Sequence, residues 1–203
     1  MWTDAAWEDE VGTLGIVAFD PITAKYFYSY ITCPAYILEL LVPRKQQIAQ
    51  MEVLAGIAFY FTFPELARGR DIIHFIDNYG AITALLNGAA RSPDTNRLVH
   101  IFHMFNSGLN NHIYWDWVAS HANIADLPSR MDFSLLIKLN AEWGDMILPT
   151  AEQFKAPFAY WRSQAEPLQH IQENMALLQK RKRPCGSARA EKKRKQKGGV
   201  AVS

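Results

Sequence analysis

The sequence has little cysteine and no apolar run long enough to cross a membrane. Its two cysteines, Cys33 and Cys185, lack CxxC spacing, which argues against a disulfide framework and a cysteine zinc site. The longest apolar run, Val53 to Phe63, is well short of the ~20 residues that a membrane helix needs. The first residues do not show the basic region and apolar core of a secretory signal peptide. We therefore expect a nuclear or cytoplasmic protein that is not secreted and has no membrane partner.

Positive charge is scarce except near the C-terminus. Residues 1–179 hold 11 basic and 19 acidic residues, a net charge of −8, whereas residues 180–203 have a net charge of +9. A tail of that composition cannot bury a core and is predicted to be disordered. Two clusters in it are typical of a bipartite nuclear-import signal or a nucleic-acid-binding tail, although a solvated run without a function is the alternative. The clusters are Lys180, Arg181, Lys182, Arg183 and Lys192, Lys193, Arg194, Lys195.

The order of predicted elements indicates an α/β fold. With 203 residues and 49% hydrophobic content, the chain can bury one sizeable core. Two β-rich runs on either side of a turn predict an antiparallel hairpin, and a strand ending at Asp77 is followed at once by a helix. A mixed sheet flanked by helices is the expected architecture. The predicted strands cover 2–6, 14–19, 26–31, 72–76 and 112–118, and the predicted helices cover 46–64, 79–87 and a segment that begins at 92–93.

Four acidic residues stand on or beside apolar elements, where a charge needs a reason. Glu52 is the one charge in the helix predicted over 46–64, and Asp77 ends a buried strand. Asp4 lies in the first strand, and Asp126 follows the last one. Glu52 could instead pair with an arginine, and Asp126 could simply stabilise a helix start. Four carboxylates that converge are what two-metal phosphoryl transfer requires, because they hold two Mg²⁺ ions ~4 Å apart.

Four segments around these acids resemble, in order, the four motifs of ribonuclease H domains attached to retroelement reverse transcriptases. The segments are Trp2 to Ala5, Gln50 to Ala55, Ile76 to Ala81 and Ser120 to Arg130, which together span about two thirds of the chain. The resemblance implies a ribonuclease H-like mixed five-stranded sheet. It also implies an endonuclease that hydrolyses the RNA strand of RNA–DNA hybrids with two Mg²⁺ ions, with Mn²⁺ as a possible substitute.

The resemblance also assigns roles to individual residues. It implies that Asp4, Glu52, Asp77 and Asp126 bind the metal ions, and that His121 assists proton transfer or product release. Asn78 and Ser120 are further candidates for contacts with the substrate backbone. The implied partners are an RNA–DNA hybrid and a reverse transcriptase domain.

Three regions follow from this interpretation. We expect a ribonuclease H-like domain over 1–135, a partly helical C-terminal extension over 136–179 and the disordered basic tail over 180–203. The short first strand suggests a fragment of a longer polyprotein or an incomplete gene model. One rival hypothesis is therefore an inactive module of the same fold that is structural or binds nucleic acid. Another is a related nuclease that is an exonuclease or cuts DNA.

Overall fold

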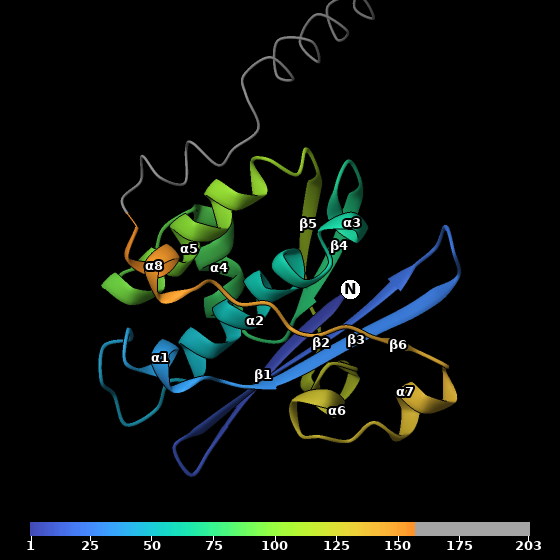
Figure 1. The fold of residues 1–203 in the computed structure, drawn as a ribbon, viewed down its shortest axis with the longest axis horizontal. Helices are drawn as coiled ribbons and strands as arrows, with labels where there is room; N and C mark the ends of the chain where they lie inside the picture. The colour runs from blue at the N-terminus through green and yellow to red at the C-terminus, as the bar shows by residue number, and fades with distance from the viewer. Residues whose placement is uncertain (157–203) are drawn as a thin grey trace, which may run out of the picture. The chain divides into compact units, whose positions relative to one another are not determined.

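A mixed six-stranded sheet with helices on both faces forms the body of the protein (Figure 1). The computed structural model describes residues 1–156. The strand order is β5-β4-β1-β2-β3-β6. The predicted α/β class with a mixed, helix-flanked sheet is confirmed. The strands are β1 (Trp2–Glu8), β2 (Val11–Asp20), β3 (Lys25–Thr32), β4 (Asp71–Ile76), β5 (His112–Trp117) and β6 (Glu142–Trp143).

The number of strands differs from the five that we expected. The sixth strand, β6, pairs in parallel with β3 through only two residues, Glu142 and Trp143. So short a strand leaves no alternating pattern in the sequence, which is why the sequence did not predict it. The predicted domain boundary at residue 135 falls within helix α7 (Ser134–Lys138).

The first three strands form an antiparallel meander, and the predicted hairpin is its second half. β2 and β3 pair from Asp20 and Lys25 through to Thr13 and Thr32. The Asp20 carboxylate accepts hydrogen bonds from the Ile22 backbone N–H and the Thr23 hydroxyl, which satisfies polar groups in the turn. β1 also pairs in parallel with β4, and β4 with β5. β1 therefore lies between the antiparallel and the parallel halves of the sheet.

Helix α2 (Ile48–Thr62) is the centre of the main core. Every residue from Gln50 to Phe61 is buried, because β1 and β2 pack on one side of the helix and the later helices α4 (Tyr79–Asn87) and α5 (Pro93–Asn106) pack on others. A helix that is apolar on all sides fits this central position. Pro64 follows it and begins α3 (Pro64–Ala67), as expected for a proline at the first position of a helix.

Two further helices cover the parallel half of the sheet. α4 (Tyr79–Asn87) starts at Asn78, whose side-chain oxygen accepts a hydrogen bond from the Ala81 N–H. It ends at Gly88, whose left-handed φ of 66° favours glycine. α5 (Pro93–Asn106) follows Ser92. The helices predicted at these places are confirmed. Two short helices, α1 (Ala35–Leu38) and α8 (Ala151–Lys155), follow β3 and β6 along the chain.

The opposite face of the sheet carries the segment that follows β5. This segment contains the 3-10 turn η1 (Ser120–Ala122) and helices α6 (Asp126–Ser129) and α7, and α6 packs on β1, β2 and β3. The close approach requires glycine at position 15, because a Cβ there would lie 2.5 Å from the Ala125 carbonyl oxygen. Gly15 thus seats α6 directly on β2.

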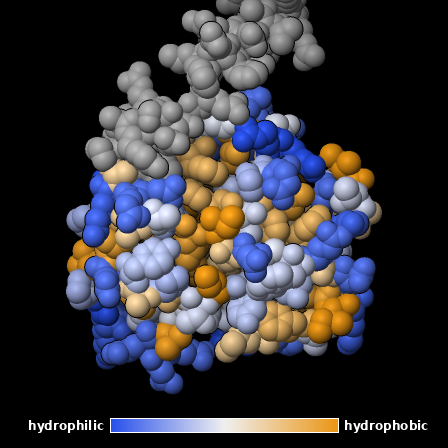
Figure 2. Space-filling view, viewed as in Figure 1, coloured by the Kyte–Doolittle hydropathy of each residue, from blue (hydrophilic) through white to orange (hydrophobic). Residues whose placement is uncertain are grey.

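The described part of the surface is mixed in polarity. Figure 2 shows apolar and charged residues side by side on the face turned toward the viewer. Within residues 1–156, no helix has both the length and the apolar character needed to span a membrane.

Candidate metal centre

The acid site lies where β4 ends beside β1. β4 stops at Ile76, and its ladder with β1 consists of the pair Trp2 and Phe75, whereas β1 continues to Glu8. The edge of β1 that β4 leaves uncovered is open to side chains from α2 and from the residue after β4. Sites of open α/β sheets gather at such carboxyl ends of parallel strands. Asp77 is the first residue beyond the strand.

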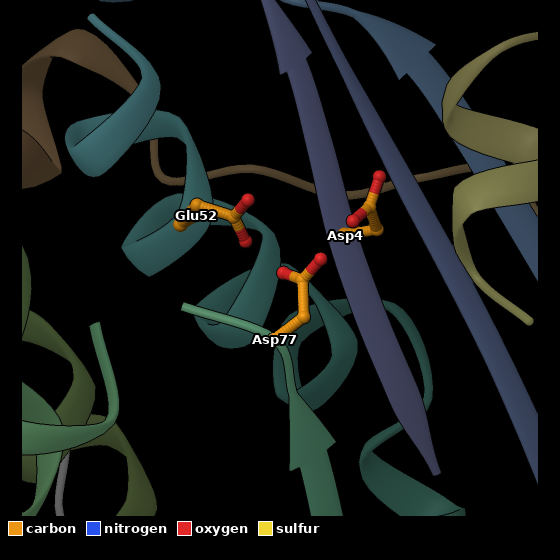
Figure 3. A group of neighbouring side chains, drawn as sticks. All are labelled: Asp4, Glu52 and Asp77. Carbon is orange, nitrogen blue, oxygen red and sulfur yellow. The ribbon is translucent and has the colours of Figure 1, made fainter. Parts of the chain in front are cut away.

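Three carboxylates meet at this corner. Asp4 comes from β1, Glu52 from α2 and Asp77 from the end of β4, and each offers an oxygen within 4.8 Å of the other two (Figure 3). Asp4 is 3% exposed and Glu52 is 4% exposed. Within residues 1–156, none of the three forms an ion pair with a lysine, arginine or histidine. This group could hold a metal ion.

Glu52 is buried, and one of its carboxylate oxygens has no partner among the described residues. The backbone of Ala5 favours the charged form of the carboxylate and so lowers its pKa, but burial outweighs this effect. Its Oε2 atom has no hydrogen-bond partner among the described residues. Burial, followed by the charges of Asp4 and Asp77, raises the pKa of Glu52 well above its ordinary value. A buried carboxylate oxygen with no partner is destabilising unless a cation or a proton binds it.

Asp4 is held by two neutral donors from the segment above it. The Ser129 hydroxyl donates to Asp4 Oδ2 at 2.5 Å, and the Asn123 side-chain amide donates to Oδ1 at 3.3 Å. Burial raises the pKa of Asp4 to about 7, because it outweighs the lowering effect of the Ser129 hydrogen bond. Asn123 also donates to the Thr3 carbonyl, which fixes the segment against β1.

The three side chains fit a divalent cation that prefers oxygen ligands. Carboxylate oxygens are the usual protein ligands of Mg²⁺, Mn²⁺ and Ca²⁺. The open Oε2 of Glu52 provides a ligand atom that no protein group uses among residues 1–156. A cation would also supply the positive charge that the group lacks.

The fourth predicted acid, Asp126, stands at the edge of this group. Its Oδ1 atom accepts a hydrogen bond from Arg130 Nε at 2.7 Å, and Arg130 also pairs with Glu8. Asp126 lies outside the set of acids whose oxygens fall within 4.8 Å of one another. Its charge nevertheless raises the pKa of both Asp4 and Glu52. The structure therefore brings three of the four predicted acids together and leaves Asp126 paired with Arg130.

The remaining candidates are exposed or partly exposed, or lie beyond the described residues. Ser120 and His121 are exposed in η1, between β5 and α6. Asn78 follows Asp77 directly and caps α4 through its side-chain oxygen. The two basic clusters of residues 180–195 lie outside the residues that the structure describes.

Sequence reasoning did not assign the two donors that hold Asp4. Asn123 and Ser129 belong to the segment that carries the fourth motif, so the segment was identified but their roles were not. Their spacing of 119 and 125 residues from Asp4 leaves no local signal. Gly15 is a partial signal, because a glycine within a strand often marks a close approach of another backbone.

One cavity of about 480 Å³ lies elsewhere, at the start of β1. It is lined mainly by apolar side chains, among them Phe19, Phe59 and Phe75, and none of the four predicted acids lines it.

Comparisons of the chain with protein-family models, with curated proteins and with solved structures find no match.

Proposed function

We propose that the chain is a metal-dependent endonuclease of the ribonuclease H type, which hydrolyses the RNA strand of RNA–DNA hybrids with two Mg²⁺ ions. The observation that carries the proposal is the meeting of Asp4, Glu52 and Asp77 at one end of the parallel strands. They come from the first, second and third motifs of the resemblance. Buried carboxylates without a basic partner are costly to keep, so a cation-binding role explains why they lie together.

The arrangement of the sheet supports the same proposal. The α/β architecture with a mixed sheet is compatible with a ribonuclease H-like fold, with β6 as a short addition at one edge. The resemblance requires acids on the first strand, on the first long helix and at the end of a parallel strand. These are β1, α2 and the corner after β4 in this chain.

Each residue of the site has a definite task in the proposed reaction. Bound Mg²⁺ would activate water and stabilise the departing oxygen of the scissile phosphodiester. Ser129 and Asn123 fix the Asp4 carboxylate. His121, exposed on η1, would accept or return a proton at its imidazole. The hybrid would be recognised by its backbone shape and 2′-hydroxyl groups.

Asp126 would join the other three acids when substrate and metal are bound. Its carboxylate is now paired with Arg130, which is exposed and can turn toward a phosphate. The exchange would free Asp126 as a ligand and give Arg130 an anionic partner. A reverse transcriptase domain as partner and a nuclear or cytoplasmic location remain part of the proposal.

The test is cleavage of a labelled RNA–DNA hybrid by the full chain. We expect the RNA strand to be cut at internal positions in Mg²⁺ or Mn²⁺, and cutting to stop when a chelator removes the metal. DNA duplex, single-stranded RNA and end-labelled hybrid serve as comparison substrates. Asp77→Asn protein, purified in parallel, controls for a contaminating nuclease.

The pattern of products separates the proposal from its rivals. Stepwise loss from one end identifies an exonuclease, and cutting of the DNA strand identifies a different nuclease. Metal-independent binding of hybrid without any cleavage identifies an inactive binding module. The pairing of Asp126 with Arg130 is the observation that favours this last rival.

A further inference from the structure

Two large aromatic side chains are exposed beside the acid site. Tyr79, at the first position of α4, is 65% exposed, and Trp117, at the last position of β5, is 43% exposed. Their rings stack with centroids 5.4 Å apart and an angle of 8° between the planes. The Trp117 indole N–H donates to the backbone oxygen of Asp77 at 3.0 Å. The pair is therefore fixed to a residue that contributes a carboxylate to the candidate metal centre.

This pair differs from the other aromatic contacts of the molecule. Among the ring pairs described within residues 1–156, Tyr79 and Trp117 form the pair in which both side chains are exposed. Packing in a core does not explain it, because neither side chain is in the core. Exposed aromatic surface that is held in one orientation is typical of a binding surface.

We propose that Tyr79 and Trp117 form a stacking platform for an unpaired nucleobase next to the hybrid, on the strand whose backbone enters the acid site. This inference rests on the proposed function and names the part of the substrate that the platform holds. Every base presents a planar face, so stacking tolerates any sequence, as an enzyme that reads backbone shape requires. Stacking also needs no positive charge, which suits residues 1–179 with their net charge of −8.

Steady-state cleavage by the full chain tests the platform, with a labelled RNA–DNA hybrid whose RNA strand continues beyond the duplex as a single strand. We expect Tyr79→Ala to raise KM about tenfold, because a stacked base is lost, with little change in kcat. Tyr79→Phe keeps the stacking ring and should retain the wild-type KM. Tyr114→Ala is the matched control, because Tyr114 lies on the same strand and is 66% exposed. It should also behave as wild type.

Fluorescence supplies a readout that does not depend on cleavage. Hybrid added in the presence of a chelator should quench tryptophan emission of the wild type, and Trp117→Phe should remove much of that quenching. If the wild type cuts nothing but Tyr79→Ala weakens hybrid binding about tenfold and Tyr114→Ala does not, the platform stands and the proposed nuclease fails. If the wild type cuts hybrid and the KM of Tyr79→Ala is unchanged, the platform is wrong and the nuclease stands. A fall in kcat at constant KM would also overturn the platform.

Discussion

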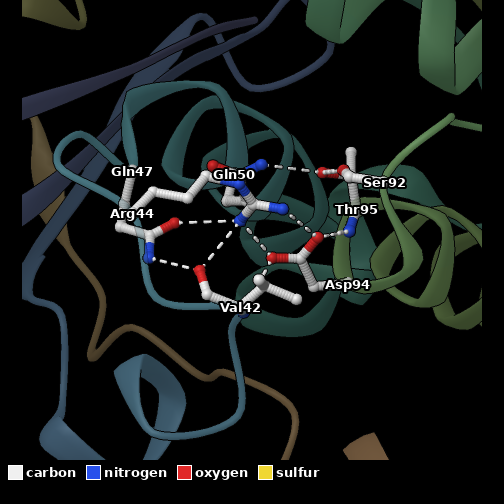
Figure 4. Close-up of polar contacts among 7 residues, drawn as sticks. All are labelled: Val42, Arg44, Gln47, Gln50, Ser92, Asp94 and Thr95. Carbon is white, nitrogen blue, oxygen red and sulfur yellow. Dashed lines mark hydrogen bonds and ion pairs between the residues drawn. The ribbon is translucent and has the colours of Figure 1, made fainter.

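Two buried acidic sites of this protein meet the cost of burial in opposite ways. At one, Asp94 on α5 accepts hydrogen bonds from both terminal nitrogens of Arg44 and from the backbone N–H groups of Val42 and Thr95 (Figure 4). At the other, Asp4, Glu52 and Asp77 lie together without a basic partner among residues 1–156. The protein supplies the counter-charge at the first site and does not supply it at the second.

The pKa values follow from this difference. Hydrogen bonds from Arg44, Val42 and Thr95 overcome the burial of Asp94 and lower its pKa below the ordinary value of 3.8. Burial has the opposite result at the other site, where it raises the pKa of Asp4 to about 7. The Arg44 and Asp94 site is thus complete as a structural link between the loop before α2 and the start of α5. The three-acid site could hold a cation, which would supply the counter-charge that the described residues do not.

The largest expected effect is the loss of activity in Asp77→Asn. A bound metal supplies several kcal/mol of transition-state stabilisation, so we expect hybrid cleavage to fall by on the order of a thousandfold. The melting temperature of this variant without metal should stay the same or rise, because a repulsive charge is removed. Asp94→Asn is the matched change at the other site. It should lower the melting temperature and leave kcat at the wild-type value. Wild-type cleavage by Asp77→Asn would show that Asp77 is not a ligand.

The next effect is on stability at the paired site. Arg44→Met leaves the 5% exposed Asp94 without its guanidinium partner. Removing one partner of a buried pair costs about 3–5 kcal/mol of unfolding free energy. Because Arg44 is partly exposed, we expect the lower end of that range, about 3 kcal/mol. The melting temperature should then fall by about 6–12 °C for a domain of this size.

A surface ion pair provides the control for that change. Lys25 pairs with Glu142, and both side chains are about half exposed, so Lys25→Met should cost less than about 1 kcal/mol. Equal losses in Arg44→Met and Lys25→Met would mean that burial does not strengthen the Asp94 pair. The contrast between the two acidic sites would then lose its physical basis.

The sequence predicts the helices and strands that carry the two acidic sites better than the side-chain contacts within those sites. Apolar periodicity and turn residues located β2, β3, α2, α4 and α5, because local patterns decide those elements. Glu52 was identified because it is the one charge in an apolar helix. The link between Arg44 and Asp94 spans 50 residues, and nothing local distinguishes Arg44 from a surface arginine. The pairing of Asp126 with Arg130 was missed although the spacing of four is common in helices.

The effect of metal on stability should also distinguish the two sites, and it should be somewhat smaller than the effect of Arg44→Met. A ligand that binds only the folded state at 100 times its dissociation constant stabilises that state by about 2.7 kcal/mol. Mg²⁺ or Mn²⁺ should therefore raise the melting temperature of the wild type. Glu52→Gln should lose most of this rise, because a charged ligand becomes neutral. Arg44→Met should have a lower melting temperature without metal but show the same rise with metal as the wild type. A smaller rise in Arg44→Met would mean that the metal acts outside the three-acid site.

The smallest predicted effect is the loss of the Arg44 contribution in acid. Because the folded-state pKa of Asp94 lies below its unfolded value of 3.8, the pair contributes stability above that value and loses it as pH falls toward the folded-state pKa. The difference in unfolding free energy between wild type and Arg44→Met should therefore be constant from about pH 5 to 8 and shrink by about 1–2 kcal/mol below about pH 4. Denaturant unfolding of both proteins without metal across this range measures the difference directly. Asp20, which pairs with Arg70, also has a lowered pKa, but it is common to both proteins and cancels in the difference. A difference that grew in acid would mean that Asp94 is protonated in the folded wild type, and the two acidic sites would then share one behaviour.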